Sequence, residues 1–204
     1  MLETGEGLAS FKFIGGALCL DFANTGDLLR DYDALVAWLH LAGELDEGQA
    51  GRLRVVMHSD VDQARRAFQR AVSLRKAIHR IFSLRARGDA PAECDVERLS
   101  VLVGKSAKYR ALRPSPDGFG WRWQGVEEQL DWPAWIIARS AAELLTSDRQ
   151  NRVRECAAHD CRWLFVDVSR NRSRRWCDMA DCGNRAKARR NYSRKRGRSA
   201  LSAE

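Results

Sequence analysis

Apolar positions recur at helical spacing through much of the chain, and the clearest run begins after Asp60 and ends before Gly88. Asp60 and Gln63 are spaced like a capping box, and Gly88 is a typical helix stop. The residues of the apolar stripe are Ala64, Phe68, Ala71, Val72, Ile78, Ile81 and Phe82. The pattern predicts one long amphipathic helix, whose other face carries Arg65, Arg66, Arg70 and Arg80 toward solvent.

Shorter stretches with the same repeat predict further helices over residues 31–41, 47–57 and 96–107. A last helix of this part is expected to be capped by Asp131, and Pro133 falls in its first turn, where it is tolerated. Helices therefore dominate the first three quarters of the chain.

Strand signals are fewer. Residues 109–112 and 119–123 flank the turn-rich segment 114–118 and predict a β-hairpin. Weak alternation over residues 11–14 predicts a short strand, and the apolar run 17–25 is compatible with strand or helix. We expect an α+β domain that is mainly helical.

Charge divides the chain into two parts. Residues 1–150 carry 20 Lys and Arg against 21 Asp and Glu, whereas residues 151–204 carry 15 against 6. This contrast predicts a neutral domain over residues 1–150 and a basic module over residues 151–204. A concentrated basic patch favours a polyanionic partner.

The hydropathy pattern argues against a membrane protein. No apolar run approaches the ~18 residues of a membrane span. Residues 1–10 lack the basic and apolar regions of a signal peptide. We expect a cytoplasmic protein that does not contact a membrane.

Four of the six cysteines form a cluster with the spacing Cys156-x4-Cys161-x15-Cys177-x4-Cys182. Two short-spaced pairs can supply the four tetrahedral thiolates that zinc prefers. Four thiolates close the coordination sphere, so this Zn²⁺ would be structural. The alternatives are two disulfides, unrelated free thiols, or replacement of one cysteine ligand by His159.

The segments around the cysteines predict a treble-clef-like zinc module. Residues 163–166 are strongly β-prone, residues 169–173 resemble a turn, and residues 174–176 can form the return strand. Residues 183–196 then predict a helix that follows the second cysteine pair. Such a small module buries little apolar surface, so metal binding would supply much of its folding free energy.

Cations surround the axis of this last helix and extend onto the preceding segment, which favours contact with nucleic acid phosphates. Asn and Arg side chains can also read base edges. The candidate nucleic-acid-binding residues are Arg174, Arg175, Asn184, Arg185, Lys187, Arg189, Arg190, Arg194, Lys195 and Arg196. DNA is the expected partner; RNA, an acidic protein partner, or a solvated tail are the alternatives.

Two groups in the first 150 residues could form a ligand site. Asp21, Asn24 and Thr25 close an apolar run and could line an effector pocket, or serve as a helix cap and turn. Trp121 and Trp123 could stack on a ligand or belong to the core. No phosphate loop, nucleophile elbow or His-carboxylate group is present, so we expect no catalytic residues and no enzyme.

The residues around the last cysteines carry a family resemblance. Arg174-Arg175-Trp176-Cys177 and Cys182-Gly183-Asn184-Arg185 resemble the CGNR zinc-finger family, named after the second tetrad. The segment 15–25 (GGALCLDFANT) resembles the opening motif of the ABATE domain that usually precedes this finger. The resemblance implies a bacterial transcription regulator, of the kind sometimes called stress-induced. In that view residues 1–150 sense a signal or mediate association, for example as a homodimer.

Within the CGNR tetrad the roles of Asn184 and Arg185 stay open. Gly183 would let the backbone approach the metal turn without a clash from Cβ. Asn184 and Arg185 could then stabilise the finger or contact DNA.

Overall fold

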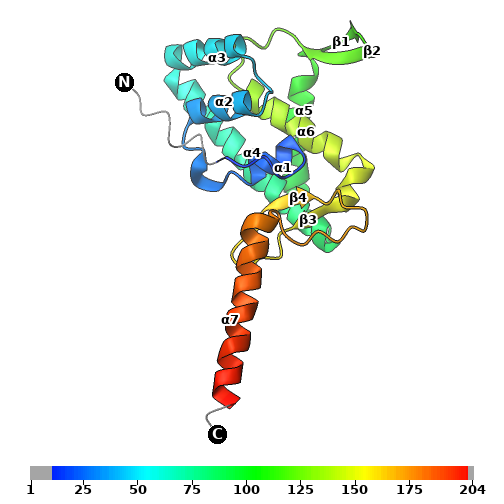
Figure 1. Ribbon diagram of the computed structural model, residues 1–204. Coiled ribbons are helices and arrows are strands. Elements are labelled where there is room, and N and C mark those ends of the chain that lie inside the picture. The colour runs from blue at the N-terminus through cyan, green and yellow to red at the C-terminus, as the bar shows by residue number, and fades with distance from the viewer. Residues whose placement is uncertain (1–10, 202–204) are drawn as a thin grey trace.

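The computed structural model describes residues 11–201 of the 204-residue chain, with side chains described for residues 11–192 (Figure 1). The first part contains α1 (Leu18–Ala23), η2 (Gly26–Leu28), α2 (Tyr32–Leu41), α3 (Glu47–Ser59), α4 (Val61–Arg87), α5 (Glu93–Ala107), β1 (Arg110–Ser115), β2 (Gly118–Trp123) and α6 (Trp132–Leu145). The second part contains η3 (Asp148–Arg152), β3 (Val153–Glu155), β4 (Leu164–Val166), η4 (Met179–Gly183) and α7 (Asn184–Leu201).

The long helix α4 runs through the middle of the molecule, and the sequence predicts both of its ends. The Asp60 carboxylate accepts a hydrogen bond from the Gln63 backbone N–H at 2.8 Å, as an N-cap does. Gly88 ends the helix with φ +87°, in the left-handed region that favours glycine. The buried face of α4 carries Ala71, Leu74 and Ile78, which lie in the centre of the main core.

The other helices pack around α4, and not all of their starts follow local sequence signals. At the start of α3, Asp46 and Gln49 form a capping box with bonds in both directions. At the start of α6 the predicted cap is wrong, because the Asp131 carboxylate makes no cap bond and instead pairs with Arg70 of α4 at 2.7 Å. The predicted helices are all present, and the ambiguous run 17–25 contains α1.

The predicted hairpin is confirmed as β1 and β2, with longer strands than expected. The two strands pair antiparallel from Arg110 opposite Trp123 to Ser115 opposite Gly118. The hairpin projects from the helices at one end of the molecule (Figure 1). The predicted strand over residues 11–14 is wrong, because this segment is irregular.

A second hairpin, β3 with β4, joins the cysteine module to the helices. Val153, Leu164 and Val166 are buried in the same apolar core as the helices. The predicted return strand over residues 174–176 is wrong, because β4 pairs with the preceding β3. The segment after β4 instead loops back toward the cysteines without a ladder.

Helix α7 extends away from the rest of the molecule, at the end opposite to the β1–β2 hairpin (Figure 1). The expected fold class is confirmed: a mainly helical α+β body with a β-hairpin, followed by a small cysteine-rich module and a helix. Within the described residues, no helix is both long and apolar enough to cross a membrane.

Candidate metal centre and nucleic-acid surface

The structure gathers the four clustered cysteines at one point. Cys156 follows β3 and Cys161 precedes β4, so the first pair lies on the turn between these strands. Cys177 ends the long loop after β4, and Cys182 lies in the π-helical turn η4. All four Sγ atoms lie within 4.8 Å of one another.

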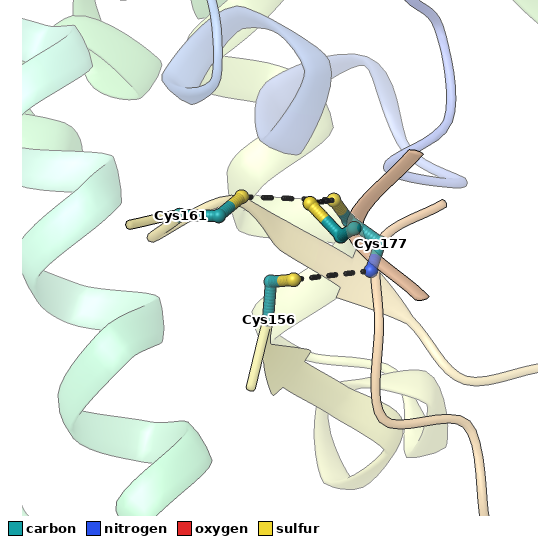
Figure 2. Close-up of side chains that lie close together, drawn as sticks. Cys156, Cys161 and Cys177 are labelled. Atoms are coloured by element: carbon teal, nitrogen blue, oxygen red, sulfur yellow. Dashed lines mark hydrogen bonds between the residues drawn. The ribbon is translucent and has the colours of Figure 1, made fainter. Parts of the chain in front are cut away.

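The sulfur geometry fits a tetrahedral ion. The Sγ atoms of Cys161 and Cys177 are 3.7 Å apart, as are those of Cys177 and Cys182. Four thiolates at the usual Zn–S distance of about 2.3 Å have a sulfur–sulfur separation of about 3.8 Å. In Figure 2 the Cys161 sulfur faces that of Cys177, while the Cys177 backbone N–H donates to the Cys156 sulfur at 3.4 Å.

The surroundings of two of the sulfurs disfavour the free thiolate form. Burial raises the pKa of the Cys161 thiol to about 11 and also raises the pKa of Cys177. Without a cation these two thiols therefore stay protonated, and a divalent metal held between the four sulfurs would favour the thiolate form. His159 is not part of the ligand group found among the described residues.

Asp167, which sequence reasoning missed, organises the loop between β4 and Cys177. Its fully buried carboxylate accepts bonds from the backbone N–H groups of Ser169 and Arg174 at 2.8 and 3.0 Å. Burial opposes ionisation of Asp167, but these hydrogen bonds outweigh it and hold its pKa below the ordinary value. Asp167 has this role because the loop folds back and brings the Arg174 N–H to its carboxylate. The sequence around Asp167 gives no signal for that contact.

Arg174 points into the module and not toward solvent. Its guanidinium donates to the carbonyl oxygens of Trp176 and Cys177 and lies 4.4 Å from the ring centroid of Phe165. This candidate nucleic-acid contact therefore holds the metal loop in place. Arg175, the next residue, is exposed beside the Trp176 ring.

The arginines in the first turns of α7 pair with a carboxylate on the β3–β4 turn that sequence reasoning also missed. Asp160, next to the first cysteine pair, lies 3.7 Å from the Arg185 guanidinium and 3.3 Å from that of Arg189. Arg185 also donates to the Cys182 sulfur at 3.2 Å. These contacts favour the finger-stabilising interpretation of Arg185.

The two other positions of the CGNR tetrad have local contacts. Asn184 donates from its side-chain amide to the Ala180 carbonyl at 2.9 Å, one helical turn back. A Cβ atom on Gly183 would collide with the Met179 side chain. The geometry thus gives these residues roles within the finger.

Further along α7, Lys187 and Arg190 are exposed. Neither has a carboxylate within 4.0 Å in the part of the chain whose side chains are described. Arg175 is likewise exposed and without a carboxylate within 4.0 Å in that part of the chain, so these three candidate contacts are accessible to a phosphate. The side chains of Arg194, Lys195 and Arg196 lie outside the described residues.

Asp21, Asn24 and Thr25 are buried, and their polar atoms bond within the protein. The Asp21 carboxylate accepts a bond from the Gly15 N–H at 2.7 Å. The Thr25 hydroxyl donates to the Phe22 carbonyl at 2.8 Å. A ligand pocket at these residues stays a prediction. In the structure their polar side-chain atoms bond to backbone groups of the protein.

Asn24 links the body to the cysteine module. Its side-chain amide donates to the Leu164 carbonyl at 2.9 Å and accepts from the Leu164 N–H at 2.8 Å. The Gly15 carbonyl accepts a bond from the Val166 N–H at 2.8 Å on the same edge of β4. Residues 15–24 thus act in place of a third strand beside β4.

The two tryptophans of the first hairpin differ in environment. Trp123 is half-buried against Trp132 in an edge-on contact with centroids 6.4 Å apart. Trp121 is exposed. Trp123 therefore packs against the core, while the Trp121 ring is exposed and could stack on a ligand.

Comparisons with known families match two successive segments of the chain. A model for ABATE, described as "Putative stress-induced transcription regulator", matches residues 16–148, and a model for the CGNR zinc finger matches residues 152–195. A search of curated proteins found no match. Because the first model covers well over half of the chain and the second follows it directly, the chain belongs to the ABATE family and carries a C-terminal CGNR zinc finger.

Proposed function

We propose that this protein is a cytoplasmic, bacterial-type transcription regulator that binds duplex DNA through its zinc-loaded C-terminal module. The observation that carries the proposal is a helix, α7, that starts at the four-cysteine cluster, projects from the body and exposes cations such as Lys187 and Arg190. The family descriptions support a regulator. Residues 1–150 would then sense a signal or mediate self-association, and residues 151–204 would form the DNA-binding module.

In this proposal Cys156, Cys161, Cys177 and Cys182 hold one structural Zn²⁺, which closes the loop between β4 and α7. The metal supplies rigidity and no open coordination position. The chain's own contribution is to orient α7: Arg174 fixes the loop before Cys177, and Arg185 fixes the helix start against Cys182.

Metal content tests the first half of the proposal. Analysis of the purified protein should find about one zinc per chain for a four-thiolate site. Cys177→Ser should abolish zinc binding, whereas Cys94→Ser, at an exposed cysteine outside the cluster, should leave it intact. A metal-free chain with an unchanged finger would contradict the metal site.

DNA binding tests the second half. The zinc-loaded chain should bind random-sequence duplex DNA, with log K falling linearly with log salt because phosphate contacts release counterions. Selection of bound genomic fragments would then identify a preferred site. Stronger binding to structured RNA would favour an RNA-binding protein, and binding to neither would favour a protein–protein adaptor.

A further inference from the structure

The β1–β2 hairpin has one aromatic face. Side chains of alternate residues share a face of a strand, and the observed register places Leu112 opposite Trp121 and Pro114 opposite Phe119. Arg110 and Trp123 form the next pair on this face, at the inner end of the hairpin. The opposite face carries arginines and glycines.

The outer part of this face is uncovered. Phe119 is 73% exposed, Trp121 59% and Leu112 54%. The Arg110 guanidinium lies 5.1 Å from the ring centroid of Trp121 and 5.5 Å from that of Trp123, which restrains the Trp121 ring. The hairpin therefore presents two aromatic rings to solvent.

The same segment concentrates the positive charge of the body. Residues 105–123 carry five cations and one acidic residue, whereas the remainder of residues 1–150 has a net charge of −5. The cations are Lys105, Lys108, Arg110, Arg113 and Arg122.

Some arginines of the body are neutralised by carboxylate partners, whereas these five cations, in the part of the chain that the structure describes, are not. Arg54, Arg80 and Arg139, for example, each pair with an acidic side chain. Within the described residues none of the five has a carboxylate within 4.0 Å: Lys105 and Lys108 at the end of α5, and Arg110, Arg113 and Arg122 on the hairpin strands. The hairpin is thus complementary in charge to an anionic partner, and its net positive charge opposes face-to-face pairing with a second copy.

We propose that the β1–β2 hairpin is a second nucleic-acid site that binds single strands, with unpaired bases stacked on Trp121 and Phe119 and phosphates held by Arg110 on the same face and by Arg113 and Arg122, which flank it on the two strands. Exposed π-faces are available in a single strand and hidden inside a duplex, and aromatic side chains beside cations are how proteins hold single strands. Residues two apart on a strand are about 6.8 Å apart, which lets two successive splayed bases each meet a ring.

This site does not depend on the finger. The hairpin and α7 lie at opposite ends of the molecule (Figure 1), so a single strand on the hairpin and a duplex on α7 can bind together. Failure of either site leaves the other testable.

The experiment compares two apolar replacements in the zinc-loaded full chain. Trp121→Phe keeps an aromatic ring, and Trp121→Leu keeps apolar area but loses the π-face. The probe is a fluorescently labelled 20-nucleotide oligo(dT), with binding followed by anisotropy. Trp121→Leu should weaken binding about 5- to 150-fold, the range for loss of one base–aromatic stack, and Trp121→Phe by less than about threefold.

Controls separate this surface from the rest of the chain. Val55→Ala, at another exposed apolar position, and Arg66→Gln, at an exposed cation of α4, should leave oligo(dT) binding unchanged. Binding to a 20-base-pair duplex should be insensitive to Trp121→Leu. If Trp121→Leu fails to fold by circular dichroism, Phe119→Leu against Phe119→Tyr makes the same comparison.

Two results would overturn the proposal. One is oligo(dT) affinity of Trp121→Leu equal to that of the original chain. The other is a dimer in sedimentation that Trp121→Leu dissociates without loss of oligo(dT) affinity, which would make the hairpin a self-association surface. Loss of duplex binding with intact, Trp121-dependent oligo(dT) binding would count against the finger and not against the hairpin.

Discussion

The carboxylate of Asp21 is buried at the junction of the body and β4, and its burial makes the stability of the fold depend on pH. Burial raises the pKa of Asp21 from 3.8 to about 6, and the bond from the Gly15 N–H offsets only part of this effect. The native state therefore holds this proton more tightly than the unfolded chain does. The resulting stabilisation is complete below pH about 4 and is lost as the pH rises through about 6.

Asp21→Asn should remove this pH dependence, because an amide oxygen can still accept the Gly15 bond and carries no charge. At pH 7 the variant should be more stable by about 2–3 kcal/mol, and near pH 4 the difference should vanish. Urea unfolding at the two pH values measures both quantities, with Asp117→Asn on the hairpin turn as the control. Equal effects of Asp21→Asn at both pH values would contradict the assignment.

Asn24 supports the edge of β4 with two bonds, so its loss leaves two backbone groups of Leu164 without partners. Each buried, unsatisfied backbone group costs about 1–3 kcal/mol. Asn24→Ala should therefore lower the free energy of unfolding by several kcal/mol, as measured by urea denaturation. Asn191→Ala, on the exposed surface of α7, should change it little; similar losses from both variants would argue against the role of Asn24.

At the residue scale, the gathering of four cysteines was predictable and the polar contacts around them were not. Spacing alone selected Cys156, Cys161, Cys177 and Cys182, because two short-spaced pairs match the needs of a tetrahedral ion. Arg174 belongs to a basic run, yet its contact with Phe165 depends on how the loop returns, which sequence spacing does not encode.

At the scale of elements, helices were predicted well because their signals are local. The ends of α4 follow from Asp60 and Gly88, whose caps act within one turn. Strand pairing is non-local, and here the sequence prediction failed: β4 pairs with β3 and not with residues 174–176. Strand β3 has three residues, too few for an alternation of apolar and polar positions to predict it from the sequence.

Helix α7 offers a test that separates phosphate contact from structural support. Arg190 is exposed, so Arg190→Gln should flatten the slope of log K against log salt by about 0.9 on duplex DNA and leave the melting temperature unchanged. Arg174 is tied to the metal loop, so Arg174→Gln should lower the melting temperature of the zinc-loaded chain.

Titration of labelled duplex at four salt concentrations gives the slopes, and calorimetry gives the melting temperatures. Arg66→Gln on α4 is the matched control for both measurements. An unchanged slope for Arg190→Gln would remove this part of α7 from the DNA surface.

At the scale of the whole molecule, the body and the module share one core although their charges divide them. The sequence places a boundary after residue 150, where the net charge changes. The structure buries Val153, Leu164 and Val166, from beyond that boundary, against the helices. Composition reveals how charge is distributed along a chain, whereas the packing of a later strand on an earlier helix depends on tertiary structure.

The shared core gives a prediction for truncated chains. A fragment of residues 1–150 lacks these three aliphatic side chains, each of which contributes about 1.5–3 kcal/mol when buried. Their sum is a large part of the roughly 5–15 kcal/mol that stabilises a typical domain, so this fragment should unfold at much lower urea than the full chain. A fragment of residues 1–168 keeps β3 and β4 and should regain much of the lost stability, although both fragments lack α7 and should not bind duplex DNA. Equal urea midpoints for the two fragments would mean that the hairpin adds nothing to the body, and that the charge boundary is also the folding boundary.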